Sequence, residues 1–424
     1  MLEFCDLPYV FVPPRPSRFW MRVGALVNRF WYFPKPVHRI RGVVVDDPHG
    51  LRQRLPADGS GHFLFLANHS RHSDPQVMTE AFRRIGASSC FMAAYELFHR
   101  GKLDAWMLPR LGVFSVDREG SDMKAMRAAG AVLRDGPHAL TMFPEGNVYL
   151  TNDAVTPFLE GAAFAGLRAQ RELESASIRV VPVSIKYTLV DDCRDAVRRQ
   201  LEWLAGEAGL HLRDDANLRD ELARIALALL ARLLERHGYE TVAPSPEATE
   251  RLVREVPRGI IRRLQETMGQ TKGDPDDWAG QIRKLRSAIH QARTGGASLP
   301  AGADPERCAR DAMLAQRVLT YKPTYIREKP TLDRFAETVE KITEDWTDRM
   351  ADALGWRRAV VRFNEAIDLA GHMPAFTRSP REAVARLTRA VEEAVQRGLD
   401  EVAGHLRTPG SEEFTVCGAA KVVD

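Results

Sequence analysis

The chain has 424 residues, of which 44% are hydrophobic and 28% are charged. This composition excludes a disordered, collagen-like or disulfide-scaffold protein, and it is typical of a globular protein with one large core or two. Lysine and arginine number 60 and aspartate and glutamate 57, so the net charge of +3 gives no reason to expect a nucleic-acid partner. An anionic partner would have to be met by a local cluster of basic residues.

Cysteine spacing and hydropathy indicate the compartment. The 5 cysteines stand far apart, without a CxxC pair or the cysteine and histidine spacing that zinc requires, so we expect reduced thiols and no metal site. The longest nearly apolar run, 225–231, is bounded by arginines, whereas a spanning helix needs about 20 apolar residues. Glu3 and Asp6 stand where a signal peptide carries positive charge. We therefore expect a cytoplasmic protein.

The first 40 residues form an aromatic and basic segment, most marked over residues 11–33. If a helix begins after Ser17 as N-cap, its arginines and its large apolar side chains lie on opposite sides. These two sets are Arg18, Arg22 and Arg29 against Trp20, Val23, Val27, Phe30 and Trp31. Two interpretations stay open: a helix at an anionic membrane surface, or a helix that packs its apolar stripe on the core.

Residues 41–190 alternate short β-branched or aromatic runs with helical patterns, which predicts an α/β domain with a mainly parallel sheet. The expected strands are 42–45, 62–67, 89–93, 113–116, 139–143 and 179–187. The expected helices between them are 75–85, 96–108, 122–133 and 157–171.

From 191 to 356 the pattern changes to charged amphipathic helices, which predicts a large all-helical insertion. The expected helices are 196–204, 218–236, 248–267, 278–293 and 332–354. Residues 357–405 then contain a strand-like run at 359–369 and a helix at 380–402, before a tail at 406–424. Because a lone strand needs a sheet to pair with, we expect 357–405 to return to the α/β domain.

A histidine and an aspartate follow the expected strand 62–67. His69 lies at its carboxyl end, where open α/β sheets place ligand sites, and Asp74 with Pro75 begins the next helix. In this corner Asp74 can orient His69 and stabilise its imidazolium, so the pair is a candidate general base. His99 and Asp104 have the same spacing, but no strand leads into that histidine.

Further polar groups are expected at the same edge of the sheet. Glu145, in the FPEG run at 143–146, follows the strand 139–143. Arg118 follows the strand 113–116, and its planar guanidinium suits a phosphate.

The order and spacing of these blocks resemble the phospholipid/glycerol acyltransferase family, which includes the 1-acylglycerol-3-phosphate acyltransferases. The blocks are His69 and Asp74 in HxxxxD; Gly112, Phe114 and Arg118; FPEG; and Val181 with Pro182. The resemblance implies transfer of an acyl chain from acyl-CoA or acyl-carrier protein, as co-substrate, to a hydroxyl of a (lyso)glycerolipid, without a cofactor or metal.

By the same resemblance, His69 is the base and Asp74 orients it. Arg118 binds the acceptor phosphate, and Glu145 and Gly146 shape the acceptor pocket, with Gly112, Asn147 and Arg71 as further candidates for substrate binding. Separately, the aromatic and basic face of residues 11–33, together with the apolar product of such a reaction, predicts a protein that is peripheral on the inner face of the cell membrane.

The sequence departs from the family pattern at a place that bears on the acceptor. Many family members continue FPEG with Thr and Arg, whereas Asn147 and Val148 follow here. Either another cation substitutes, or the acceptor is not a glycerol phosphate; the candidate cations are Arg71, Lys124, Arg127 and Lys186. Two other functions stay open: a hydrolase of lipid esters or thioesters that uses the same base, and a non-catalytic lipid-binding protein.

Overall fold

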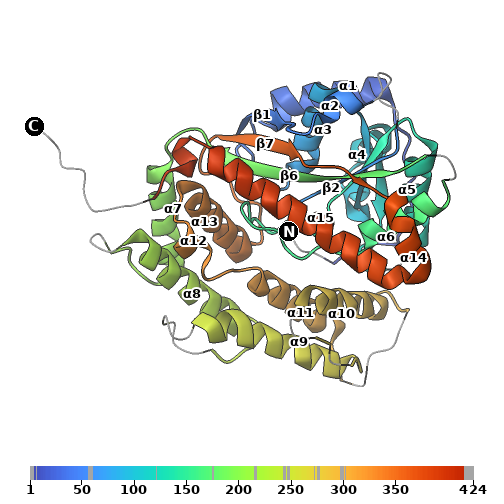
Figure 1. Ribbon diagram of the computed structural model, residues 1–424. Helices are drawn as coiled ribbons and strands as arrows, with labels where there is room; N and C mark the ends of the chain where they lie inside the picture. Colours follow the sequence, from blue (N-terminus) through green and yellow to red (C-terminus); the bar gives the residue numbers. More distant parts are fainter. Residues whose placement is uncertain are drawn as a thin grey trace, which may run out of the picture. The chain divides into compact units, whose positions relative to one another are not determined.

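The structure is a computed structural model, and it divides into two compact units (Figure 1). It describes residues 4–5, 7–55, 61–120, 122–173, 176–213, 217–241, 245, 249–271, 273–274, 277–296, 300 and 302–414. One unit comprises residues 7–188 and 356–406, and we call it the α/β unit. The other comprises 1–6, 189–355 and 407–424, and we call it the helical unit.

The α/β unit is built on an eight-stranded sheet with the order β1-β7-β6-β2-β5-β3-β4, with β8 paired to β6. The strands are β1 Ile40–Asp46, β2 Phe63–Ala67, β3 Ser89–Ala94, β4 Val113–Val116, β5 Ala139–Met142, β6 Arg179–Leu189, β7 Arg357–Phe363 and β8 Ile367–Asp368. The pairings of β2 with β5 and β6, of β3 with β4 and β5, and of β1 with β7 are parallel, whereas β8 is antiparallel. This arrangement confirms the α/β class predicted from the sequence.

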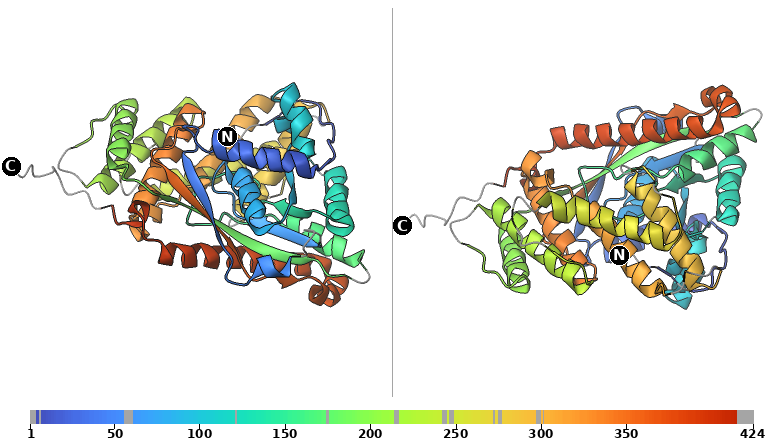
Figure 2. Two further views of the ribbon diagram at one scale, coloured as in Figure 1. Left: turned by 90° about the horizontal axis from the view of Figure 1, so that it is seen from above. Right: turned by 90° about the horizontal axis from the view of Figure 1, so that it is seen from below.

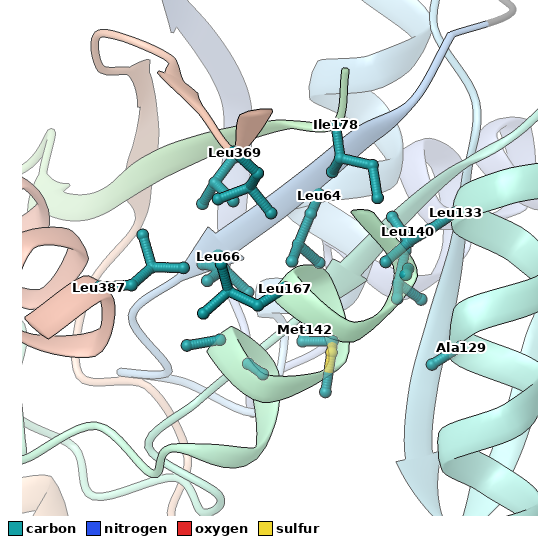
Figure 3. Packing of buried hydrophobic residues seen from close by; sticks show 14 of the residues in the cluster. Leu64, Leu66, Ala129, Leu133, Leu140, Met142, Leu167, Ile178, Leu369 and Leu387 are labelled. Carbon is teal, nitrogen blue, oxygen red and sulfur yellow. The ribbon is translucent and has the colours of Figure 1, made fainter. Parts of the chain in front are cut away.

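Helices cover both faces of the sheet, because the strands alternate two apolar sets of side chains (Figure 2). On β2, Leu64 and Leu66 enter one core cluster, and Phe63 and Phe65 enter the other. Figure 3 shows the first cluster, in which Leu64 and Leu66 pack with Leu167 and with residues of the late helix such as Leu387. The helices of this unit are α1 Arg18–Val27, α2 Leu51–Arg54, α3 Asp74–Ile85, α4 Lys102–Arg110, α5 Met123–Asp135, α6 Gly161–Arg171, α14 Met373–Arg378 and α15 Pro380–His405.

The chain returns to the sheet after the helical unit. Strand β7 inserts between β1 and β6, and its register with β1 pairs Val45 with Val361. Helix α15 then lies along one face of the sheet (Figure 1). The run expected at 359–369 is thus two strands, interrupted at Asn364, whose N–H and Nδ2 both donate to the carbonyl of Pro182. Pro182 itself lies on the interior strand β6, not at an edge.

In the helical unit, helices pack around two apolar clusters. They are α7 Arg194–Glu207, α8 Leu218–Arg236, the π-helical turn η3 Arg251–Glu255, α9 Val256–Thr267, α10 Trp278–Arg293, α11 Pro305–Leu319, α12 Tyr325–Glu328 and α13 Leu332–Thr347. Helix α11 was not expected, although Asp304 caps its N-terminus by accepting from the N–H of Glu306. Residue 248, where the sequence places a helix start, lies outside the described residues.

Several expected helices have different bounds, and three of the differences bear on how the chain is held locally. The stretch 96–108 is a 3-10 turn, η2 Tyr95–His99, and α4, separated at Gly101. Helix α6 begins at Gly161 rather than near 157, after a non-helical stretch in which the N–H of Phe158 donates to Glu392 of α15. Helix α13 ends at Thr347, because Asp348 adopts a left-handed φ of 55°.

The close packing of α15 on β6 makes a testable prediction. A Cβ at Gly398 would come within 2.3 Å of Ser184 Oγ, so Gly398→Ala should lower the free energy of unfolding by about 1–3 kcal/mol. Gly404→Ala is the control, because a Cβ there meets nothing within 4 Å. Thermal unfolding of the two variants checks this; equal stability would contradict the close packing.

Candidate functional site

The candidate site is the corner between β2 and α3. The ring nitrogen Nδ1 of His69 lies 2.8 Å from Oδ2 of Asp74. The Asp74 side chain is fully buried, whereas His69 is partly exposed. Asp74 is the first residue of α3 and Ser73 takes the N-cap position, one residue earlier than expected. With Nδ1–H donated to Asp74, a neutral His69 keeps its lone pair on Nε2 and can accept a proton there.

Both oxygens of the Asp74 carboxylate are held by donors. Oδ2 also accepts from the backbone N–H of Arg71 at 2.9 Å. Oδ1 accepts from the hydroxyl of Tyr187 at 2.6 Å. Bonds of this kind offset the cost of burying a carboxylate and fix its orientation toward His69.

The loop after β5 holds the other side of His69. The Phe143 ring stacks on the imidazole at a centroid distance of 4.3 Å. Glu145 is buried, and its carboxylate accepts from the N–H of His69 at 2.8 Å and from that of Thr156 at 3.3 Å. Glu145 caps no helix here, so the contact with His69 is its structural role.

Strand β6 supplies a residue that sequence analysis did not identify. The side-chain amide of Asn68 bonds both the N–H and the carbonyl of Ile185, which fixes the end of β2 to β6. Two residues further, Tyr187 reaches Asp74. No local sequence motif identifies Tyr187, because its partner Asp74 lies 113 residues away in the chain. Its only sequence signal is a buried-strand pattern that ends in a polar aromatic residue.

Arg118 lies at the same edge of the sheet, after β4. Its guanidinium donates to Asn147 Oδ1 at 2.9 Å and pairs with the carboxylate of Glu96. Glu96, from the turn after β3, was not identified from the sequence. The arrangement joins the carboxyl ends of β3, β4 and β5 through side-chain contacts.

The two candidate glycines have different places. Gly146 has a φ of +77° directly after Glu145, and a Cβ there would come within 2.9 Å of Leu159. Gly112, with a φ of +83°, precedes β4 and so lies at the opposite end of that strand from Arg118. Its positive φ favours glycine, and a Cβ there would also come within 2.7 Å of the terminal methyl group of Met21.

The cations considered for a phosphate have unequal access. Lys186 is buried and pairs with Asp153, which removes it from the surface. Lys124 and Arg127 are exposed on α5. Arg71 belongs to the corner itself, and its guanidinium lies 5.6 Å from the centre of the Tyr187 ring. The described residues contain no group of three or more potential metal ligands.

Burial raises the pKa of Glu145 to about 8, although the two N–H donors oppose the shift. A carboxyl whose pKa is raised by folding ionises more readily in the unfolded chain. Its contribution to stability is therefore full below its ordinary pKa of 4.5 and is lost as the pH rises to about 8.

Glu145→Gln should therefore change how stability depends on pH. Glutamine does not ionise, so the Tm of the variant should rise relative to wild type between about pH 5 and about pH 8. A change of about 1 kcal/mol corresponds to about 2–4 °C for a domain of this size. Thermal unfolding across this range measures the difference; parallel Tm curves would show that Glu145 ionises normally.

Part of the chain is similar to a known protein family. Residues 43–186, about a third of the chain, match the Acyltransferase family model. The match spans β1 to β6 and so includes the His69, Glu145 and Arg118 positions. No curated protein matches the chain. Residues 43–186 therefore form an acyltransferase-family domain.

Proposed function

We propose that the protein transfers a fatty acyl chain from a thioester donor, acyl-CoA or acyl-carrier protein, to a hydroxyl of a lysoglycerolipid. The observation that carries the proposal is the His69–Asp74 pair at the carboxyl edge of β2, within an acyltransferase-family domain. His69 is partly exposed and Asp74 is wholly buried, which is the arrangement that a base and its orienting carboxylate need.

The reaction needs a single base. Nε2 of His69 accepts the proton of the acceptor hydroxyl while the oxygen attacks the thioester carbonyl carbon. The tetrahedral intermediate expels the thiolate, which takes the proton from the imidazolium. The products are an ester and a free thiol, and no acyl-enzyme forms. Asp74 stabilises the imidazolium, and Phe143 and Glu145 hold the ring and backbone of His69 in place.

Recognition of the acceptor headgroup is assigned to the loop after β5 and to Arg118. Arg118, Asn147 and Gly146 lie at the same sheet edge as His69, and Arg71 adds a cation in the corner. The guanidinium of Arg118 already has two partners, so a phosphate acceptor must displace Glu96 or bind beside it.

We further propose that α1 and the π-helical turn η1 Asn28–Tyr32 rest on an anionic membrane surface at the cytoplasmic face. Three of their large apolar side chains are exposed: Phe19 by 64%, Phe30 by 72% and Trp31 by 64%. Such a patch is favoured at a lipid interface, where aromatic rings sit at headgroup depth.

Cations border this patch, and α4 extends it. Exposed Arg18, Arg22 and Arg29 lie on the same segment. Trp106 of α4 is 42% exposed and packs edge-on against Trp20. Leu103, in the first turn of the same helix, is also exposed. In the part of the chain that the structure describes, no helix is long and apolar enough to span a membrane. A surface contact is the mode of membrane binding that these residues support.

Substitution of the base tests the catalytic proposal. His69→Ala should lower acyl transfer by at least about 100-fold with little change in Tm. His99→Ala is the matched control, because His99 has the same spacing to an aspartate but is exposed in the turn after β3.

The assay is mass spectrometry of products from a long-chain acyl-CoA or acyl-carrier protein, with phosphorylated and non-phosphorylated lysolipids as acceptors. Full activity of His69→Ala would exclude His69 as the base. Free fatty acid formed without an acceptor would identify a hydrolase, and no product with either donor would favour a non-catalytic protein.

The membrane proposal is tested with the double variant Phe30→Ser, Trp31→Ser. Sedimentation with anionic vesicles should fall by at least about tenfold, because two large apolar side chains no longer enter the interface. Trp203→Ser is the control, since Trp203 is 41% exposed on α7. These two substitutions are a more specific test than deletion of residues 11–33, because the deletion would also remove Phe33, which is buried. Equal sedimentation of all three proteins would contradict the proposal.

A further inference from the structure

The tyrosine behind the candidate base is unusually well fixed. Tyr187 is 1% exposed, and its hydroxyl lies 2.6 Å from Oδ1 of Asp74 and 3.2 Å from Ser73 Oγ. The side-chain amide of Asn152 bonds both the N–H and the carbonyl of Tyr187, each at 2.7 Å. Two segments, the turn at 73–74 and the loop that carries Asn152, thus hold Tyr187 on β6 with its phenol against the carboxylate of Asp74.

We propose that Tyr187 is a positioning residue that sets the basicity of His69 through Asp74. The inference rests on the proposed function in treating His69 as the base. By donating to Oδ1, the phenol takes up part of the negative charge of the carboxylate and turns Oδ2 toward the imidazole. It thereby limits how strongly Asp74 stabilises the imidazolium of His69.

The phenol is suited to this role because it remains a donor. Burial and the neighbouring Asp74 raise the pKa of Tyr187 well above its ordinary value. The hydroxyl therefore does not ionise over the pH range in which histidine titrates. A serine or water at the same place would be free to rotate or exchange, whereas the Tyr187 ring is fixed by packing in the sheet core.

Other charged and titratable groups surround His69 and Asp74. These groups are present both in the wild type and in a Tyr187 variant. Burial and Asp74 raise the pKa of Tyr32 to about 12, while burial and nearby cations lower that of His38 to about 4. The groups from the elements around the corner are Arg71, His72, Glu145, Tyr32, Lys35, His38 and Arg100. A difference between wild type and a Tyr187 variant therefore reports the phenol itself.

Tyr187→Phe removes the donor and keeps the ring. The carboxylate then stabilises the imidazolium more strongly, so the pKa of His69 should rise by about 0.5–1 unit. The acidic limb of kcat/KM should move to higher pH by the same amount, with activity lost at low pH and largely recovered at high pH.

Tyr321→Phe is the matched control. The hydroxyl of Tyr321 also lies 2.6 Å from a carboxylate oxygen, that of Asp345 in the helical unit. This variant removes the same kind of bond and should lower stability without moving the titration of His69.

The His69 titration is measured by NMR in the full chain, so it does not require activity. A raised His69 pKa in Tyr187→Phe alone supports the inference. In an Asp74→Asn background, Tyr187→Phe should leave the His69 pKa unchanged, because the effect passes through Asp74. If Tyr187→Phe lowers the Tm but leaves the His69 pKa unchanged, the inference is overturned. The bond from Tyr187 to Asp74 would then serve stability alone.

Should Tyr187→Phe not fold, site-specific Tyr187→3-fluorotyrosine keeps the hydroxyl and makes it a stronger donor. The His69 pKa should then fall; a rise or no change would overturn the inference. Absence of acyl transfer in the wild-type protein would reject the proposed function alone, since the titration stands without it.

Discussion

The buried carboxylate of Asp74 is the group on which the arrangement of the corner depends. A carboxylate without solvent is costly unless each oxygen has donors, and here they come from His69, from the backbone of Arg71 and from Tyr187. These donors lie on three segments: the end of β2, the turn into α3, and β6. A shift of any one would leave the buried carboxylate with fewer hydrogen bonds, so the carboxylate couples the sheet register to the orientation of the imidazole.

The need to hold Tyr187 against Asp74 also gives a role to helix α15, the last long helix of the α/β unit. The loop between β5 and α6 carries Asn152, which fixes Tyr187, and it is itself held by α15. Gln396 bonds both Asp153 and Val155, and Glu392 bonds Phe158. Helix α15 thus supports the loop that supports Tyr187, although more than 200 residues separate the helix and the loop in the chain. The returning segment completes the sheet and also stabilises the walls of the site.

Local patterns predicted much of this site, and long-range contacts account for the rest. The strand before His69, the helix after Asp74 and the strand before Glu145 each have a local hydrophobic period, so their common edge of the sheet followed from parallel topology. Tyr187 and Glu96 have no such pattern, because each matters only through a partner brought close by folding. The end of α13 was also placed too late, because Asp348 ends the helix by adopting a left-handed φ.

The packing of α1 leaves part of its apolar side exposed. Ala25 is the buried residue of this helix, and a Cβ on Gly24 would come within 2.7 Å of Leu111. Of the apolar stripe expected from the sequence, Trp20 and Val23 are half-buried, whereas Val27, Phe30 and Trp31 are exposed. The first part of the stripe therefore contributes to packing, as a helix on the core does, and the second part does not. The exposed part forms an apolar patch whose free energy in water is lowered only by another apolar phase.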